Sequence, residues 1–494
     1  MLSKEQIQTE INSVITLFST GSFKESLDQL DPLIKDFPDN PILHNIMGAS
    51  LVGLGQLDNA IKSYNEAISI KPDYAKAHYN LGGAFHELGQ LEDSVKSYER
   101  SIAIESNYAE AHNNLGNVFR ELGELNTAII SYEKALIINP DYVEAHFSLA
   151  VVLYSFDQLD LMIEHLEKAI DINPNFAEAH HSLGGGYKEL GRLDDAVKSY
   201  NKALALQPNF SEAHNNLGNT FKELGQLKDA VKSYEKTLAI NPDYPSTHNN
   251  LGNVFKELGQ HNDAAKSYQN ALAINPDYSD SHNNLGVIFY ELKKYDEAVQ
   301  SYERALTIDP EYAEAHNNLG VSLNKLGQLE EAVKSYDRAL FIDPGYSDSY
   351  NNLGVVQKKQ GKLDAAIKSY ESALAINSGD ADTYNNLGIV LSELERLDDA
   401  IKSYGKAIAI NSEFAEAHNN LGHVFSKLNQ YLDALKAYEK ASAIKPDLNY
   451  VLGNILSAKM NSCSWASLTK LLNETRAKIN KNLKIIGRII YNIL

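Results

Sequence analysis

The sequence has little of what many folds depend on, with one cysteine, one tryptophan and 13 prolines in 494 residues. A single cysteine, Cys463, excludes a disulfide framework and any multi-cysteine zinc or iron–sulfur site. It fits a reducing compartment, so we expect a cytoplasmic protein. No apolar run approaches the roughly 18 to 20 residues of a membrane span, and the start, MLSKEQIQTE, lacks the apolar core of a secretion signal. Neither membrane insertion nor secretion is expected.

Basic residues are scarce relative to acidic ones. The chain has 45 Lys and Arg against 65 Asp and Glu, which gives a formal net charge of −20 and a pI near 5.2. Binding to a phosphate backbone needs a surplus of basic residues on one face. The composition therefore argues against nucleic acid as a partner. Nothing in the sequence indicates a cofactor, a bound metal or a catalytic residue.

A strict period of 34 residues is what the sequence does contain. Thirteen such units run from Ile7 to Leu448 without an insertion or a deletion. With Ala109 as position 1 of its unit, the last twelve units have Gly at position 8 in eleven cases, Ala at position 20 in ten and Pro at position 32 in nine. A long constant period predicts a solenoid rather than a set of globular domains.

Each unit has the pattern of a helical hairpin. In the unit 109–142, residues at helical spacing mark a first helix through His112, Leu115, Gly116 and Phe119. Gly123 can end that helix. The same spacing marks a second helix, which a proline then stops, through Ala128, Tyr132, Ala135 and Leu136. Small residues at positions 8 and 20 predict close contact between helices, with Tyr at position 24 filling the space beside the glycine.

This pattern resembles the tetratricopeptide repeat, which has the same period and the same Leu-Gly, Ala, aromatic and Pro signals. The resemblance implies an all-α fold, a right-handed superhelical solenoid of 34-residue helix-turn-helix repeats. We expect a degenerate capping repeat at 1–40, twelve tandem repeats at 41–448 and a helical, linker-like tail at 449–494. The capping repeat departs from the pattern where the body has Gly, Ala and Tyr, at Val14, Ser26 and Leu30.

The tail differs from the repeats in charge, with a net +6 against −26 for everything before it. It also carries a distinctive set of residues: Tyr450, Leu452, Gly453, Lys459, Met460, Cys463 and Trp465. These resemble the segment after the last repeat in bacterial O-linked N-acetylglucosamine transferase-like proteins of the SPINDLY type, glycosyltransferase family 41. Such enzymes continue into a two-lobed catalytic region, whereas this chain ends at Leu494. A frameshift or premature stop is one explanation, and no catalytic residue can be carried over.

Histidine and tyrosine are frequent, but both follow the period. Ten of the 15 histidines occupy position 4, and eleven of the 28 tyrosines occupy position 24. Side chains one repeat apart cannot converge on one metal, so we interpret both sets as packing residues. His180 and His181 point to different faces of a helix and are not a chelating pair. The glycines 184–186 lie inside a first helix and lack the trailing Lys of a phosphate loop. We interpret Cys463 as a structural thiol.

Asparagine is the remaining signal, because it is a poor helix former yet recurs inside a predicted helix. Position 6 shares a face with positions 2, 9 and 13, and the resemblance implies that this face lines an inner groove. In O-linked N-acetylglucosamine transferases a ladder of asparagines grips the protein substrate. The resemblance therefore implies that nine residues bind peptide: Asn80, Asn114, Asn216, Asn250, Asn284, Asn318, Asn352, Asn386 and Asn420. The alternative is that near-identical repeats inherited them by duplication.

The asparagine row has a gap at Ser148 and Ser182. The unit 143–176 is unusual elsewhere too, where the body has Gly, Ala and Tyr, with Ala150, Met162 and Leu166. We expect the working groove to run through the unbroken units from Asn216 to Asn420. A basic strip at position 12 would favour acidic segments, but its alternation with glutamates favours a neutralised surface instead: Lys188, Lys222 and Lys256 with Glu189, Glu223 and Glu257.

Two functions fit these patterns. The first is a protein-interaction module that captures extended segments of protein partners in the groove. The second is the substrate-recognition arm of a glycosyltransferase that moves a sugar from a UDP-sugar to Ser or Thr of a protein, with the catalytic region missing from this chain. A purely structural spacer is a third and weaker alternative.

Overall fold

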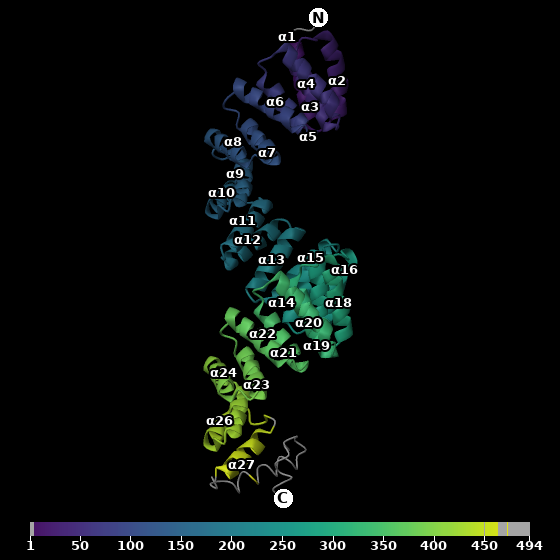
Figure 1. Cartoon of the computed structure of the whole chain (residues 1–494). Helices are drawn as coiled ribbons and strands as arrows, with labels where there is room; N and C mark the ends of the chain where they lie inside the picture. Colours follow the sequence, from purple (N-terminus) through teal and green to yellow (C-terminus); the bar gives the residue numbers. More distant parts are fainter. Residues whose placement is uncertain (1–3, 449, 463–471, 473–494) are drawn as a thin grey trace. The chain divides into compact units, whose positions relative to one another are not determined.

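The computed structural model describes residues 4–448, 450–462 and 472. Every regular element in this described part of the chain is an α-helix, as the period predicts, and there are 27 of them (Figure 1). None of these helices is both long enough and apolar enough to cross a membrane. The chain divides into two compact units, Met1–Pro242 and Asp243–Leu494, and each is described by itself.

The first unit is a series of helical hairpins in which each odd-numbered helix packs against the next even-numbered one. The helices are α1 (Lys4–Ser19), α2 (Phe23–Asp36), α3 (Pro41–Gly53), α4 (Leu57–Ile70), α5 (Ala75–Glu87), α6 (Leu91–Ile104), α7 (Ala109–Glu121), α8 (Leu125–Ile138), α9 (Val143–Ser155), α10 (Leu159–Ile172), α11 (Ala177–Glu189), α12 (Leu193–Leu206), α13 (Ser211–Glu223) and α14 (Leu227–Ile240). From α2 to α12, each second helix also contacts the first helix of the following hairpin, so the core of this unit runs from hairpin to hairpin.

The second unit repeats this arrangement and ends on an unpaired first helix within the described residues. Its helices are α15 (Pro245–Glu257), α16 (His261–Ile274), α17 (Ser279–Glu291), α18 (Tyr295–Ile308), α19 (Ala313–Leu326), α20 (Leu329–Ile342), α21 (Ser347–Lys359), α22 (Leu363–Ile376), α23 (Ala381–Glu393), α24 (Leu397–Ile410), α25 (Ala415–Lys427), α26 (Tyr431–Ile444) and α27 (Val451–Asn461). The odd-numbered helices also contact one another along the series.

A contact between glycine and tyrosine closes almost every hairpin, as the spacing of positions 8 and 24 predicts. A methyl carbon added at Gly116 would lie 2.7 Å from Cε1 of Tyr132, closer than real side-chain atoms approach. The equivalent distance from Gly320 to Tyr336 is also 2.7 Å, and both tyrosines are completely buried. The glycine is therefore required by the ring that packs against it, which explains a residue that otherwise weakens a helix.

The turn within each hairpin requires a left-handed residue at position 15. Gly123 has a φ of +78° there, a conformation that glycine adopts without strain. Four repeats hold a residue with a side chain in the same conformation: Asp157, Lys293, Glu395 and Asn429. The end of the first helix is thus set by the shape of the hairpin rather than by glycine alone.

The position-4 histidines join each first helix to the loop before it. In nine of the ten, Nε2 lies 2.8–3.4 Å from the backbone carbonyl oxygen six residues earlier, so Nε2 carries the proton and donates it. Burial lowers the pKa of His78, His112 and His316, which favours the neutral ring. The packing interpretation is therefore correct, and a hydrogen bond adds to it.

The repeat packing extends one helix beyond Leu448, where the sequence period stops. Helix α27 packs against α26 in the way that first helices pack throughout the chain, and it buries Val451 and Ile455 against Tyr438. Asn454 lies 34 residues after Asn420 and takes its register position. Two residues of the expected tail motif, Cys463 and Trp465, lie outside the described residues.

Candidate functional site

The predicted asparagine ladder is a chain of bonds between repeats. Each position-6 asparagine lies on a first helix with its side chain partly exposed. In eight of the nine, Nδ2 donates a hydrogen bond of 2.9–3.2 Å to the position-5 side chain of the preceding repeat. The acceptor is Oδ1 of an asparagine in six cases, the hydroxyl of Tyr79 in one and Nε2 of His181 in one. Asn250 holds the same register position on α15.

These bonds give the ladder a structural role that needs no bound peptide. The bonds explain why asparagine recurs inside a helix. They are also consistent with the alternative that the asparagines were inherited when the repeats were duplicated. An asparagine side chain has two N–H groups and one oxygen, and the bond between repeats uses a single N–H. Among the eight asparagines with this bond, the other N–H and the oxygen make no further side-chain bond in the described part of the chain, except at Asn114, whose Oδ1 accepts from Asn113. Peptide binding by the nine asparagines stays a prediction.

Position 5 belongs to the same network, a role that the spacing within one helix does not reveal. Asn249, Asn283 and Asn317 are buried there and accept from the ladder. Serines at position 3 donate to two of them, Ser281 to Asn249 and Ser349 to Asn317, each at 3.0 Å. The signal was present, since eight units carry the dipeptide Asn-Asn at positions 5 and 6.

The gap in the ladder leaves an identifiable atom unpaired. Oδ1 of Asn113 is buried and has no hydrogen-bond partner in the described part of the chain. The residue that would reach it, 35 positions later, is Ser148 in place of asparagine. At the next interruption, Ser182, the position-5 residue of the preceding repeat is Phe147, whose side chain has no hydrogen-bond acceptor. The two serines therefore differ: Ser148 leaves the Oδ1 atom of Asn113 unpaired, whereas Ser182 leaves no side-chain acceptor unpaired.

We call the surface formed by positions 2, 5, 6 and 9 of the first helices the ladder face. Three contacts show that these rows adjoin. Asn318 at position 6 bonds Asn283 at position 5, and Asn283 in turn lies 3.4 Å from Oε1 of Glu314 at position 2 of the next repeat. Nδ2 of Asn454 lies 3.2 Å from Nε2 of His423 at position 9.

A cleft of about 580 Å³ opens on the ladder face at the start of the first unit. Tyr79 and Tyr108 line it with their ring centres 4.8 Å apart, together with the asparagines Asn45 and Asn80. Burial raises the pKa of both tyrosines, so they keep their protons and remain hydrogen-bond donors. Aromatic walls with a few amides are a common composition for a ligand-binding cleft.

The unusual repeat 143–176 contains a pair of histidines. Nδ1 of His146 on α9 lies 2.9 Å from Nδ1 of His165 on α10. Nε2 of His146 donates to the carbonyl of Pro140, so its Nδ1 accepts and Nδ1–H of His165 donates. Burial, and to a smaller extent His146, lowers the pKa of His165. The pair is a hydrogen-bonded contact between α9 and α10. No group of three or more His, Cys, Asp or Glu that could hold a metal ion occurs among the described residues.

The lysines at position 12 form a neutralised surface where the structure shows their partners. Nζ of Lys188 lies 2.7 Å from Glu223, which is at position 13 of the next repeat. Lys358 and Glu393 make the same contact at 3.1 Å. Lys222 also has a polar partner. These pairs remove the reason to expect a basic strip that attracts acidic segments.

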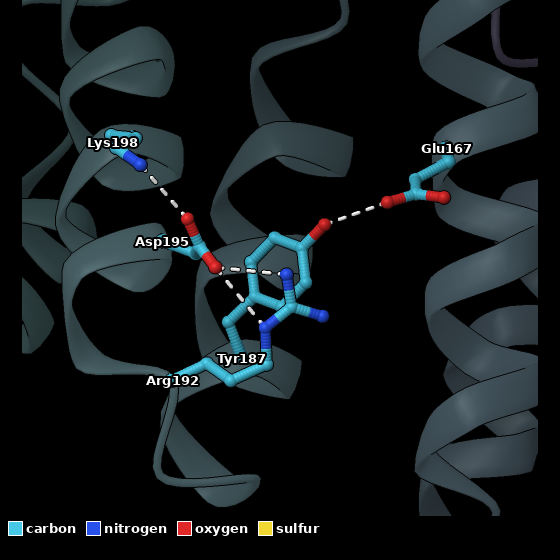
Figure 2. A network of polar contacts seen from close by, with 5 residues as sticks. All are labelled: Glu167, Tyr187, Arg192, Asp195 and Lys198. Atoms are coloured by element: carbon cyan, nitrogen blue, oxygen red, sulfur yellow. Dashed lines mark hydrogen bonds and ion pairs between the residues drawn. The ribbon is translucent and has the colours of Figure 1, made fainter.

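A polar network joins α10, α11 and α12 (Figure 2). The hydroxyl of Tyr187 donates to Glu167 at 2.6 Å, and burial raises the pKa of this tyrosine to about 12. The guanidinium of Arg192 lies 4.3 Å from the ring centre and also bonds Asp195, which Lys198 contacts at 2.9 Å. A cleft lies here, and one of the same register lies between α22 and α24. Its recurrence marks it as a product of hairpin spacing.

The fold and these contacts define a helical-repeat solenoid with amide-linked first helices. Family models described as TPR repeat match residues 48–89, 82–119, 116–155, 186–225, 218–259, 252–293, 286–327 and 322–361, and models described as tetratricopeptide repeat match 143–176, 348–413 and 379–447. The chain belongs to the tetratricopeptide repeat family. No curated protein matches it.

Solved structures with similar folds span different lengths of the chain. The crystal structure of MamA is 27% identical over 33% of this chain and 95% of its own, with a TM-score of 0.32. YrrB, titled a TPR protein with an unusual peptide-binding site, is 22% identical over 38% and 96%, with a TM-score of 0.33. The APC/C hetero-tetramer Cut9-Hcn1 is 15% identical over 92% and 96%, with a TM-score of 0.43.

Proposed function

We propose that this protein is an interaction scaffold whose ladder face binds extended segments of protein partners. Tetratricopeptide repeats support the scaffold role in general. The observation that carries the peptide role is the row of partly exposed amides from Asn284 to Asn420, one per repeat, each with one N–H already fixed by the preceding repeat. A fixed amide pays little ordering entropy on binding, and its free donor and acceptor suit a peptide backbone.

The test removes the amides without breaking the helices. Serine is the replacement, because Ser148 and Ser182 already occupy this position in folded repeats. The triple variant Asn284→Ser, Asn318→Ser and Asn352→Ser should weaken binding to an array of unstructured peptides at least about tenfold, the loss of a few hydrogen bonds. Circular dichroism should show unchanged helicity. Equal affinity of variant and parent for every bound peptide would refute the ladder as the binding site.

The glycosyltransferase arm is the finer alternative, and the tail residues alone support it. Of these, Tyr450, Leu452, Gly453, Lys459 and Met460 lie in or beside α27. The decisive measurement is the genomic sequence past the codon for Leu494, with the intact mass of the protein from its own cells. A catalytic reading frame, or a native mass far above 54.8 kDa, would make the ladder face a substrate-recognition arm. A reading frame that closes after Leu494, together with a native mass that matches the chain, would favour the scaffold role alone.

A further inference from the structure

Three rows of side chains run along the ladder face of α17, α19, α21 and α23, one member of each row per helix. Positions 2, 6 and 9 are spaced i, i+4 and i+7, so they share a face of each helix. Position 2 is acidic and exposed, in Asp280, Glu314, Asp348 and Asp382. Position 6 is the asparagine ladder. Position 9 is aliphatic and half-buried, in Val287, Val321, Val355 and Ile389.

The aliphatic row costs the fold at least one hydrogen bond. In three other repeats an asparagine at position 9 accepts a hydrogen bond from the position-24 tyrosine, as Asn253 does from Tyr268 at 2.7 Å. Tyr336 faces Val321 in that register, and its hydroxyl is buried with no partner in the described residues. A buried unpaired hydroxyl destabilises the fold. Val321 thus leaves the Tyr336 hydroxyl unpaired, while its half-exposed side chain adds aliphatic surface to the ladder face.

The acidic row is unbalanced along these four helices. Glu416, next in the row, is bridged to Lys445 at 2.8 Å, whereas the four acidic residues before it are exposed. One turn beyond position 9, position 13 carries two residues of each sign, Glu291, Lys325, Lys359 and Glu393. One edge of the face is thus negative, its middle is aliphatic, and its far edge is neutral.

We propose that the ladder face of α17, α19, α21 and α23 binds an extended segment in which a basic and an aliphatic residue each recur about every third position. This rests on the proposed function. Packed helices lie about 8–10 Å apart, and a polyproline II chain advances about 3.1 Å per residue with three residues per turn, so its residues three apart share a side. A bound segment therefore meets a new helix about every third residue. With its backbone over the asparagines, one side chain of each triplet meets a carboxylate and another meets the aliphatic row.

The probes are fluorescent synthetic peptides that differ only in this pattern. The first has about one Lys-Val-Ser triplet per helix, four in all. The second replaces each Lys by Glu, and the third replaces each Val by Ser. Anisotropy titrations of the full chain should give the first peptide an affinity at least about tenfold higher than either of the others, and added salt should weaken its binding. Binding of the glutamate peptide as tightly as the lysine peptide would overturn the proposal.

The matched variant is Val321→Asn with Val355→Asn, which restores the residue that other repeats carry and that accepts from the tyrosine. It should fold as well as the parent by circular dichroism. We expect it to bind the Lys-Val-Ser peptide at least about fivefold more weakly while its affinity for the Lys-Ser-Ser peptide is unchanged. Unchanged affinity for both would overturn the aliphatic row.

A control in the first unit separates the acidic row from simple charge. Helices α7, α9, α11 and α13 carry Glu110, Glu144, Glu178 and Glu212 at position 2 but have asparagine or glycine at most of their position-9 sites. Changing these glutamates to Gln should leave binding of the Lys-Val-Ser peptide within about twofold, whereas Asp280→Asn, Glu314→Gln, Asp348→Asn and Asp382→Asn together should reduce it about tenfold. Equal effects would overturn the proposed location.

The peptide-binding function and the preference for basic and aliphatic residues can be tested separately. If no peptide of any composition binds, both proposals fall. If the serine ladder variant loses all three peptides equally and the Val→Asn variant loses none, the ladder binds peptides without this preference.

Discussion

At the scale of single residues, each repeat is held by contacts whose partners sit at fixed register positions. The position-8 glycine accommodates a tyrosine ring, the position-4 histidine donates to a loop carbonyl, and the position-6 asparagine donates to the repeat before it. The effect of a substitution at one of these positions on stability therefore depends on the residue that the position contacts. Two pairs of substitutions separate that effect from the intrinsic preference of the residue.

Gly320→Ala should destabilise the protein, even though alanine is the better helix former by about 1 kcal/mol. The added methyl would lie 2.7 Å from Cε1 of the buried Tyr336, and overpacking of this kind costs about 1–3 kcal/mol. The control is Gly405→Ala in α24, where nothing lies within 4 Å of the added carbon. It should stabilise by about 0.5–1 kcal/mol. Urea denaturation measures both, and a stabilised Gly320 variant would contradict the contact.

Ser148→Asn should stabilise the protein by about 1 kcal/mol, the value of one buried hydrogen bond. The new amide would reach the unpaired Oδ1 of Asn113 as ladder residues elsewhere reach position 5. Ser182→Asn is the matched control, because the residue at position 5 of the preceding repeat is Phe147, which offers no acceptor to the new amide. Thermal denaturation should separate the two variants. Equal denaturation midpoints for the two variants would show that the unpaired Oδ1 of Asn113 does not lower the stability of the protein.

At the scale of helices and hairpins, much could be predicted from the sequence. The period, the Gly and Pro positions and the helical spacing place every hairpin and the glycine–tyrosine contact. Position 5 could not be assigned, because its importance comes from a neighbour 35 residues away across a helix–helix contact that the spacing within one helix does not reveal. Helix α27 was missed as a continuation for a similar reason: only Asn454 keeps the pattern there, where Gly453 and Leu456 replace the usual residues.

The pairing of α9 with α10 through His146 and His165 should make this hairpin sensitive to pH. The pKa of His165 is lowered in the folded chain, so the unfolded chain binds more protons below about pH 6.5. The contribution of this histidine to stability is therefore present above that pH and is lost as the pH falls through it. Position 23 is serine in most other repeats, so His165→Ser restores the usual residue.

Denaturation midpoints of the parent and of His165→Ser, compared at about pH 7.5 and about pH 5.5, isolate this histidine from the other titrating groups. The parent should lose more stability between the two values than the variant does. A larger loss in the variant would show that the histidine pair does not weaken on protonation.

At the scale of the whole molecule, stability should be local. Within each unit every hairpin contacts its neighbours in the series, and a solenoid of this kind behaves as a sum of repeat and interface terms. Gly116→Ala, which clashes with Tyr132 in the first unit, should raise hydrogen exchange in α7, α8 and the hairpins beside them. Exchange in α21–α24 of the second unit should stay unchanged. A uniform rise along the chain would indicate a single cooperative unit.

The register of the ladder bonds also has a genetic consequence. Donor and acceptor recur at positions 6 and 5, so any repeat with the Asn-Asn dipeptide can follow any other without leaving an unpaired amide. Unequal crossing-over between near-identical copies would add or remove 34 codons and produce a junction that bonds like its parents. The gene can therefore change length by whole hairpins while the protein stays folded, except beside Phe147 and Ser148, where a misaligned exchange would change which amides are satisfied.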